Sequence, residues 1–127
     1  MNIGEAFENG IVCGIDLNIE SDKIDYMPHK TFKGVALKHF VKGQTTNNQI
    51  SCHLVKVEPF CMLEAHTHTE QLEIHEVIFG CGDCQIAGNK IEYKPGTVGI
   101  IPPNTEHKVT AGKDGLFILA KFTPALL

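Results

Sequence analysis

The chain has 127 residues, enough to close one core, and 11 Lys+Arg against 15 Asp+Glu give it a formal net charge of −4. It contains no apolar stretch of the roughly 20 residues that a membrane span requires, so a transmembrane protein is excluded. The basic residues are scattered and outnumbered, so we expect no nucleic-acid partner, which would need clustered cations to neutralise phosphates.

Residues 1–5 show no basic region followed by an apolar segment, so we expect no export signal and a cytoplasmic location. The chain has five cysteines, an odd number. In a reducing compartment these thiols are expected to stay free rather than form a disulfide framework.

Residues 1–30 have no regular periodicity but are too apolar for a disordered arm. We predict that this N-terminal extended arm, or a short helix within it, packs on the domain formed by residues 31–127 or on a partner subunit. The apolar side chains that indicate this are Phe7, Ile11, Val12, Ile15, Leu17 and Ile19.

From residue 31 onward, short alternating runs predict β-strands, and amphipathic helical stripes are nearly absent. Turn signals separate the runs, among them residues 80–83 and 113–115. About eight short strands at this spacing are typical of an antiparallel sandwich or barrel, so we predict an all-β fold. The expected strands are 34–41, 50–58, 75–79, 84–87, 90–93, 98–101, 107–110 and 116–122.

The spacing of the seven histidines carries the main chemical signal. His66 and His68 are two residues apart, and alternate residues of a strand project from the same face, so both imidazoles can bind one ion. Such a pair can arise by chance. Here, however, Glu73 follows after enough residues to turn the chain, and a third imidazole, His107, comes after a proline-rich turn.

This pattern resembles the two sequence motifs of the cupin family, G-x5-H-x-H-x(3,4)-E-x6-G and G-x5-P-x-G-x2-H-x3-N. The resemblance covers residues 60–111, and the strand spacing extends it to about 34–122. The residues that match the motifs are His66, His68, Glu73, Gly80, Gly96, Pro102 and His107.

Three motif positions differ from the family pattern. The opening Gly is replaced by Phe60, the Gly before the last His by Asn104, and the closing Asn by Ala111. Asn tolerates a positive φ better than other non-Gly residues, so the change at Asn104 is mild. The change at Ala111 concerns the substrate pocket rather than the metal ligands.

The resemblance implies a small jelly-roll β-barrel of antiparallel strands that holds one divalent metal ion. The ligands it implies are His66, His68, Glu73 and His107; the alternative is a barrel that keeps these residues without a metal. Three imidazoles and one carboxylate suit Mn, Fe, Co, Ni, Cu or Zn, and they leave one or two coordination positions for substrate or water.

Other polar residues lie close to these positions in the sequence. Glu70 and Glu76 are alternative carboxylate ligands. Glu70 follows His68 with too few residues between them for a turn, and Glu76 projects from the opposite face of the strand from Glu73, so we expect both to be solvated. His75 lies on the same side of its strand as Glu73 and is our candidate catalytic base; the alternatives are a further metal ligand and a core histidine. We expect His53 on the inner face in a structural role.

The pair Cys81 and Cys84 forms a C-x-x-C motif. A zinc knuckle would need a second such pair, and a thioredoxin-like site would need a helix N-terminus. We therefore expect Cys81 to be exposed in a turn between strands and Cys84 to be a small apolar core residue.

These observations predict a divalent-metal-binding cupin that acts on a small-molecule substrate, as a dioxygenase or an isomerase. The alternative is a non-catalytic cupin that binds or senses a small metabolite, since fold and metal do not by themselves imply catalysis. The apolar N-terminal segment and C-terminal end predict a homodimer.

Overall fold

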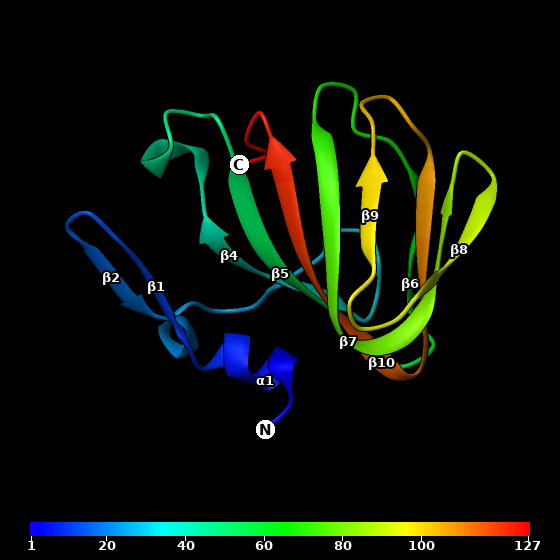
Figure 1. The fold of residues 1–127 in the computed structure, drawn as a ribbon, viewed down its shortest axis with the longest axis horizontal. Helices are drawn as coiled ribbons and strands as arrows, with labels where there is room; N and C mark the ends of the chain where they lie inside the picture. Colours follow the sequence, from blue (N-terminus) through cyan, green and yellow to red (C-terminus); the bar gives the residue numbers. More distant parts are fainter.

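The computed structural model describes residues 1–127 and shows a β-barrel with a small N-terminal extension (Figure 1). The N-terminal part contains α1 (Ile3–Glu8), β1 (Ile11–Gly14), β2 (Leu17–Glu20), a 3-10 turn (Ser21–Lys23) and β3 (Met27–Pro28). The barrel strands are β4 (Val35–Val41), β5 (Ser51–Val57), β6 (Met62–His66), β7 (Leu72–Ile86), β8 (Asn89–Tyr93), β9 (Val98–Ile101) and β10 (His107–Thr123), with a second 3-10 turn at Gly43–Thr45.

Two layers of strands share the long strands β7 and β10. The first half of β7 pairs with the second half of β10, and the second half of β7 pairs with the first half of β10. One layer therefore runs β3-β4-β5-β10-β7-β9, and the other runs β6-β10-β7-β8. Every pairing is antiparallel, which confirms the predicted all-β jelly roll.

Glycines allow β7 and β10 to bend together between the two layers. Gly80 has φ +89° and Gly115 has φ +74°, and a Cβ atom on Gly80 would clash with the carbonyl of Gly115. The turns expected at residues 80–83 and 113–115 are therefore wrong: these residues are bends inside continuous strands, because the Gly-rich composition typical of a turn also permits a close crossing of two strands.

β6 was not among the expected strands. Its residues, Met62–His66, contain no β-branched side chain and do not alternate between apolar and polar. The strand forms because it pairs with the start of β10, where His66 lies opposite His107. Tertiary pairing thus overrides a weak local preference.

The N-terminal segment contains a short helix, one of the two forms expected there, followed by a hairpin. The side chain of Asn2 caps α1 by accepting a hydrogen bond from the Glu5 backbone N–H at 2.8 Å. Gly4 of this helix faces the ring of Phe117 so closely that a side chain there would clash. The β1–β2 hairpin projects away from the barrel (Figure 1).

Apolar side chains form two clusters on opposite faces of the β5–β10 sheet. The larger, inside the barrel, comprises 12 buried residues that include Val55, Val57 and Ile118. The smaller consists of Leu54, Phe117 and Leu119, on the outer face. Adjacent residues of one strand thus enter different clusters, as the alternation of side chains in a strand requires.

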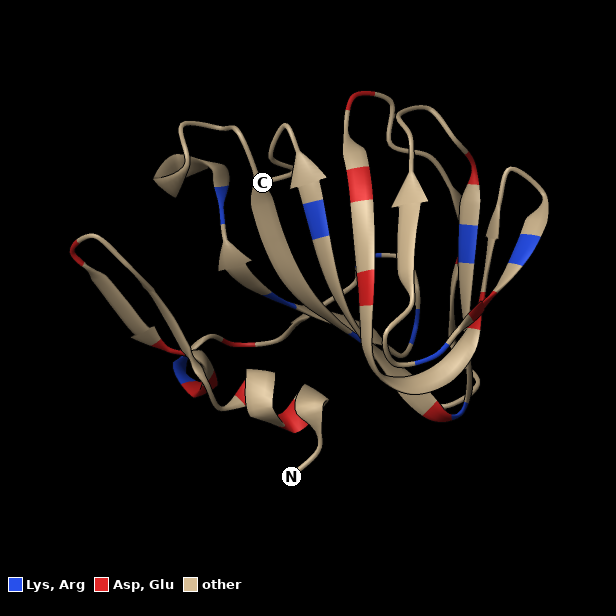
Figure 2. Cartoon of the chain, in the orientation of Figure 1, with Lys and Arg blue, Asp and Glu red and all other residues tan.

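Charged residues of both signs are scattered over the elements rather than gathered on one face (Figure 2). The lysine Nζ atoms that have acidic partners within 4.0 Å belong to Lys56, Lys90 and Lys121. None of the helices has the length and hydrophobicity that crossing a membrane would require.

Two histidines contact each other between β4 and β5. The Nδ1 atoms of His39 and His53 are 2.8 Å apart, and His53 Nε2 lies 2.9 Å from Ser51 Oγ. The Ser51 oxygen also accepts a hydrogen bond from the Leu126 backbone N–H. His53 is 0% exposed, as expected for a structural histidine. Burial, together with the charge of a protonated His39, lowers the pKa of His53 to about 4.

Phe60, at the position where the family motif has Gly, adopts a left-handed conformation with φ +62°. Its ring is 72% exposed, so the side chain contributes little packing. Asn104, the other replaced glycine, has φ +57°, in agreement with the tolerance expected of Asn. Both positions therefore adopt a left-handed backbone conformation without a glycine.

We predict that Phe60→Gly raises the free energy of unfolding by about 0.5–1 kcal/mol. A non-Gly residue at positive φ costs about 1–2 kcal/mol, and the greater freedom of Gly in the unfolded chain offsets part of that gain. Urea denaturation measures the change. Phe60→Ala is the control, because it removes the exposed ring but keeps the strain; equal stabilisation by both substitutions would contradict the assignment.

We predict that titration of His53 destabilises the protein as the pH falls from about 6.5 to 4. The unfolded chain binds a proton at His53 in this range while the folded chain does not, so the free energy of unfolding falls by on the order of 3 kcal/mol. Urea midpoints at pH 7 and 4.5 should differ less in His53→Gln than in the wild type. An unchanged difference would show that His53 does not titrate in this way.

Candidate metal centre

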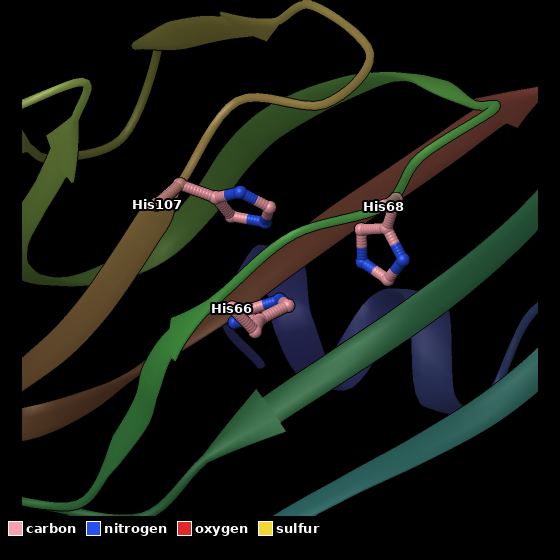
Figure 3. A group of neighbouring side chains, drawn as sticks. All are labelled: His66, His68 and His107. Atoms are coloured by element: carbon pink, nitrogen blue, oxygen red, sulfur yellow. The ribbon is translucent and has the colours of Figure 1, made fainter.

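Four candidate ligands approach one another from three parts of the barrel. His66 is the last residue of β6, His68 lies in the connection that follows, and His107 is the first residue of β10, with the three rings close together (Figure 3). Glu73 lies at the start of β7 and is only 4% exposed. The pairing of β6 with β10 and of β10 with β7 therefore joins residues that are far apart in the sequence.

The three imidazoles are close enough to share one ion, and the Glu73 carboxylate lies beside two of them. One nitrogen each of His66, His68 and His107 lie within 4.8 Å of one another. The Glu73 oxygen Oε1 lies 3.2 Å from His107 Nε2 and 3.7 Å from His68 Nε2. Ligands bound at about 2 Å to a common ion have separations of this order.

Backbone carbonyls orient two of the imidazoles. His66 Nδ1 lies 2.7 Å from the Glu64 carbonyl oxygen, and His107 Nδ1 lies 3.0 Å from the Thr105 carbonyl oxygen. A carbonyl oxygen can only accept, so each Nδ1 carries the hydrogen and the neutral ring presents the lone pair of Nε2. This is how metal-binding histidines are usually held.

Two buried atoms of the cluster have no hydrogen-bond partner: Glu73 Oε1 and His107 Nε2. The carboxylate oxygen is an acceptor, and so is the Nε2 of a neutral ring whose hydrogen is on Nδ1. Two acceptors 3.2 Å apart in a buried site need a proton or a metal cation between them. A divalent metal ion satisfies both atoms at once, so the residues fit the metal that the motif implies.

The electrostatics favour the charge states that metal binding needs. Burial lowers the pKa of His66 and His68, which keeps these imidazoles neutral. Burial acts to raise the pKa of Glu73, but the imidazoles of His75 and His107 outweigh it and hold this pKa well below its usual range. Neutral imidazoles and an ionised carboxylate are the forms that bind a metal ion.

His75 lies behind Glu73 and is bonded at both ring nitrogens. Its Nε2 is 2.6 Å from Glu73 Oε2, and its Nδ1 is 2.8 Å from the hydroxyl of Tyr93. Burial acts to lower the pKa of His75, but the Glu73 carboxylate outweighs it and raises the pKa to about 9. The two oxygens of Glu73 therefore differ: Oε2 faces His75, and Oε1 faces the imidazole cluster.

Gly99 makes room for the Tyr93 hydroxyl. It lies opposite His75 in the β7–β9 pairing, and a Cβ atom at Gly99 would clash with the hydroxyl. Sequence reasoning found neither Tyr93 nor Gly99, because their roles depend on contact across three strands. The catalytic role predicted for His75 stays a prediction; its ring lines the cavity, and both of its nitrogens are bonded to neighbouring side chains.

The other residues singled out in the sequence lie outside the cluster. Glu70 is exposed, and Glu76 is bonded to Lys121 rather than to the site. Cys84 is buried in the core, as expected. The expectation that Cys81 is exposed in a turn is wrong: it is half-buried within β7, because the strand continues through the glycine bend.

The sequence model of the Cupin domain family matches residues 53–119, which contain all four candidate ligands. The chain therefore belongs to the cupin domain family, the class that its jelly-roll fold and histidine cluster define. A search of curated proteins found no significant match.

Solved structures share this fold at low sequence identity. A predicted oxalate decarboxylase from Thermotoga maritima has a TM-score of 0.76 and 20% identity, covering 84% of this chain and 97% of that one. KdgF from Halomonas sp. has a TM-score of 0.71 and 19% identity, covering 81% and 88%. A cupin 2 conserved barrel domain protein from Rhodopseudomonas palustris has a TM-score of 0.71 and 20% identity, covering 80% and 72%. These likenesses show the fold alone.

We predict that Tyr93→Phe lowers the free energy of unfolding by about 1–3 kcal/mol, because it leaves His75 Nδ1 buried without a partner. The other tyrosine provides a matched control. Tyr26 donates its hydroxyl hydrogen to Glu8 in a partly buried contact, and Tyr26→Phe should cost less than about 1 kcal/mol. Equal decreases in the free energy of unfolding, measured by urea denaturation, would show that the Tyr93–His75 hydrogen bond contributes no more to stability than the Tyr26–Glu8 bond.

Proposed function

We propose that this cupin binds one divalent transition metal ion through His66, His68, Glu73 and His107 and acts on a small-molecule substrate. The observation that carries the proposal is the pair of buried, unpartnered acceptors, Glu73 Oε1 and His107 Nε2, which face each other in the imidazole cluster. The metal is one of Mn, Fe, Co, Ni, Cu or Zn, as the donor set indicates.

A bound divalent metal would supply Lewis-acid polarisation of a substrate oxygen, or a place for substrate beside dioxygen. The surrounding residues prepare this chemistry. Backbone carbonyls fix the rings of His66 and His107, and His75 donates its Nε2 hydrogen to Glu73 Oε2, which leaves Oε1 for the ion. Apolar side chains line the rest of the cavity and limit the access of water.

The proposed activity is that of a dioxygenase or an isomerase. Support for catalysis in general, rather than for either reaction, comes from the cavity beside the cluster and from structural neighbours with enzyme names, among them an oxalate decarboxylase and an ectoine synthase. Either reaction needs a group that moves a proton, and the Glu73–His75 pair is the proposed one.

The alternative function is non-catalytic binding or sensing of a small metabolite. The observation that favours it is that both ring nitrogens of His75 already have hydrogen-bond partners, so His75 has no free nitrogen to accept a proton from a ligand. Dioxygen consumption and product formation, measured with each metal in turn, distinguish the two functions. A tight ligand without turnover under any metal would support the binding function.

We also propose that the protein forms a homodimer and works in the cytoplasm. Support for the dimer comes from the exposed apolar side chains of the N-terminal hairpin, which include Ile11 and Ile15. A two-stranded hairpin is marginally stable by itself, so contact with a second copy would stabilise it. Light scattering at micromolar concentration tests this proposal, and a monomer would overturn it.

We predict that Glu73→Gln and His66→Ala each weaken metal binding by ~100-fold or more, because each removes a ligand. Metal content after dialysis, measured by mass spectrometry, and titration with Co²⁺ give the two readouts. Glu76→Gln is the matched control: it lies on the same strand but pairs with Lys121 away from the cluster. If Glu73→Gln keeps one tightly bound ion per chain, the ligand assignment is wrong.

A further inference from the structure

The cavity beside the candidate metal centre is lined almost entirely by apolar side chains and imidazoles. Its walls contain 14 residues, 8 of them hydrophobic, and every other lining residue is a histidine or Glu73. No lysine, aspartate, serine, threonine, asparagine or glutamine contributes to this lining, and the chain has no arginine. Apart from the metal-facing groups, the cavity therefore offers few partners for the polar groups of a ligand.

The nearby lysines are turned away from this cavity. Lys38 is buried on β4, but its ammonium donates to the carbonyls of Ser21 and Ile24 on the outer side of the sheet. Lys56 and Lys121 face Glu8 and Glu76, respectively. A ligand with a second negative charge would thus find no cation beyond the metal, and burying an unpaired charge is strongly unfavourable.

Space in the cavity is also limited. Its volume is about 80 Å³. Holding one water molecule takes about 10–15 Å³ of cavity volume, so the cavity admits a molecule with about five to eight non-hydrogen atoms. A ligand of this size whose polar head is on the metal places its remaining atoms against Leu37, Val55 and Phe122.

One polar group in the lining belongs neither to the ligand set nor to the Glu73–His75 pair. His29, just after β3, lines the cavity, and its ring stacks on Phe32 with centroids 4.5 Å apart. Its Nδ1 accepts hydrogen bonds from the backbone N–H groups of Thr31 and Phe32, at 3.1 and 3.2 Å. A ring that accepts at Nδ1 carries its hydrogen on Nε2, so His29 is a fixed hydrogen-bond donor.

We propose that the natural ligand of this site is a small molecule with an apolar body and one pair of oxygen atoms that bind the metal. His29 donates a hydrogen bond to the end of the ligand that carries these oxygen atoms. This inference rests on the proposed metal function and narrows its substrate class. It disfavours sugar acids and other polyhydroxylated or dianionic compounds, whose additional polar groups would be buried without partners.

Two matched probes test the apolar body: 2-oxobutyrate and hydroxypyruvate. They have the same chelating head, charge and number of non-hydrogen atoms, and they differ in a terminal methyl or hydroxyl group. Affinities for the Co²⁺-loaded protein are measured from the visible spectrum of the ion and divided by the affinities for free Co²⁺. We expect 2-oxobutyrate to be favoured by about tenfold or more, because the methyl is buried and the hydroxyl would lack a partner.

A variant tests the donor. His29→Phe keeps an aromatic ring against Phe32 but removes the Nε2 hydrogen, and it should weaken 2-oxobutyrate binding by about three- to tenfold without changing the Co²⁺ content. Lys30→Ala, in the same connection, is the control for a general disturbance and should have no effect. Equal losses in both variants would overturn the role of His29.

The outcomes separate this inference from the proposed function. If the protein binds Co²⁺ through the candidate ligands but favours hydroxypyruvate, binds the two probes equally or binds neither, the apolar ligand class is wrong while the metal site stands. If the folded protein binds no Co²⁺, the proposed function fails and the inference fails with it.

Discussion

The buried carboxylate of Glu73 is the constraint on which the arrangement of the barrel interior depends. An ionised group that is 4% exposed in an apolar core would be very costly without compensation, and the hydrogen bond from His75 provides part of it. His75 bonds one oxygen, and the other faces His68 and His107. Tyr93 forms a hydrogen bond with His75, and Gly99 leaves space for the Tyr93 hydroxyl. Stabilising the buried charge of Glu73 therefore involves residues on four strands.

The bend shared by β7 and β10 brings this carboxylate to the histidines. Without it, the start of β10 could not pair with both β6 and the end of β7 while its second half pairs with β5. Side-chain alternation along β5 and β10 separates the interior cluster from the outer cluster, which involves Leu54 and Phe117. The fold thus places a polar centre inside an apolar barrel and covers the opposite face of the sheet with other side chains.

The cupin fold does not by itself decide the ligand. Structures that share it at 20% identity or less carry such different names as oxalate decarboxylase, KdgF and ectoine synthase. In this chain the difference must come from the lining of the cavity. Aliphatic side chains and His29 surround the candidate ligands, and the lysines of β4, β5 and β10 are turned outward.

The sequence by itself determined the antiparallel all-β class, most of the shorter strands and the family, because alternation and the spacing from His66 to His107 are local patterns or fixed separations. It also indicated that Glu73 and His75 project from the same face of their strand, since residues two apart in a strand always do so. It did not determine that residues 80–83 bend within a strand, that Met62–His66 pairs with β10, or that α1 and a hairpin precede the barrel. Nor did it show the bond from Tyr93 to His75 or the position of His29 in the cavity. These features depend on contacts between distant segments. Only the tertiary structure decides which backbone and side-chain groups then form hydrogen bonds with one another.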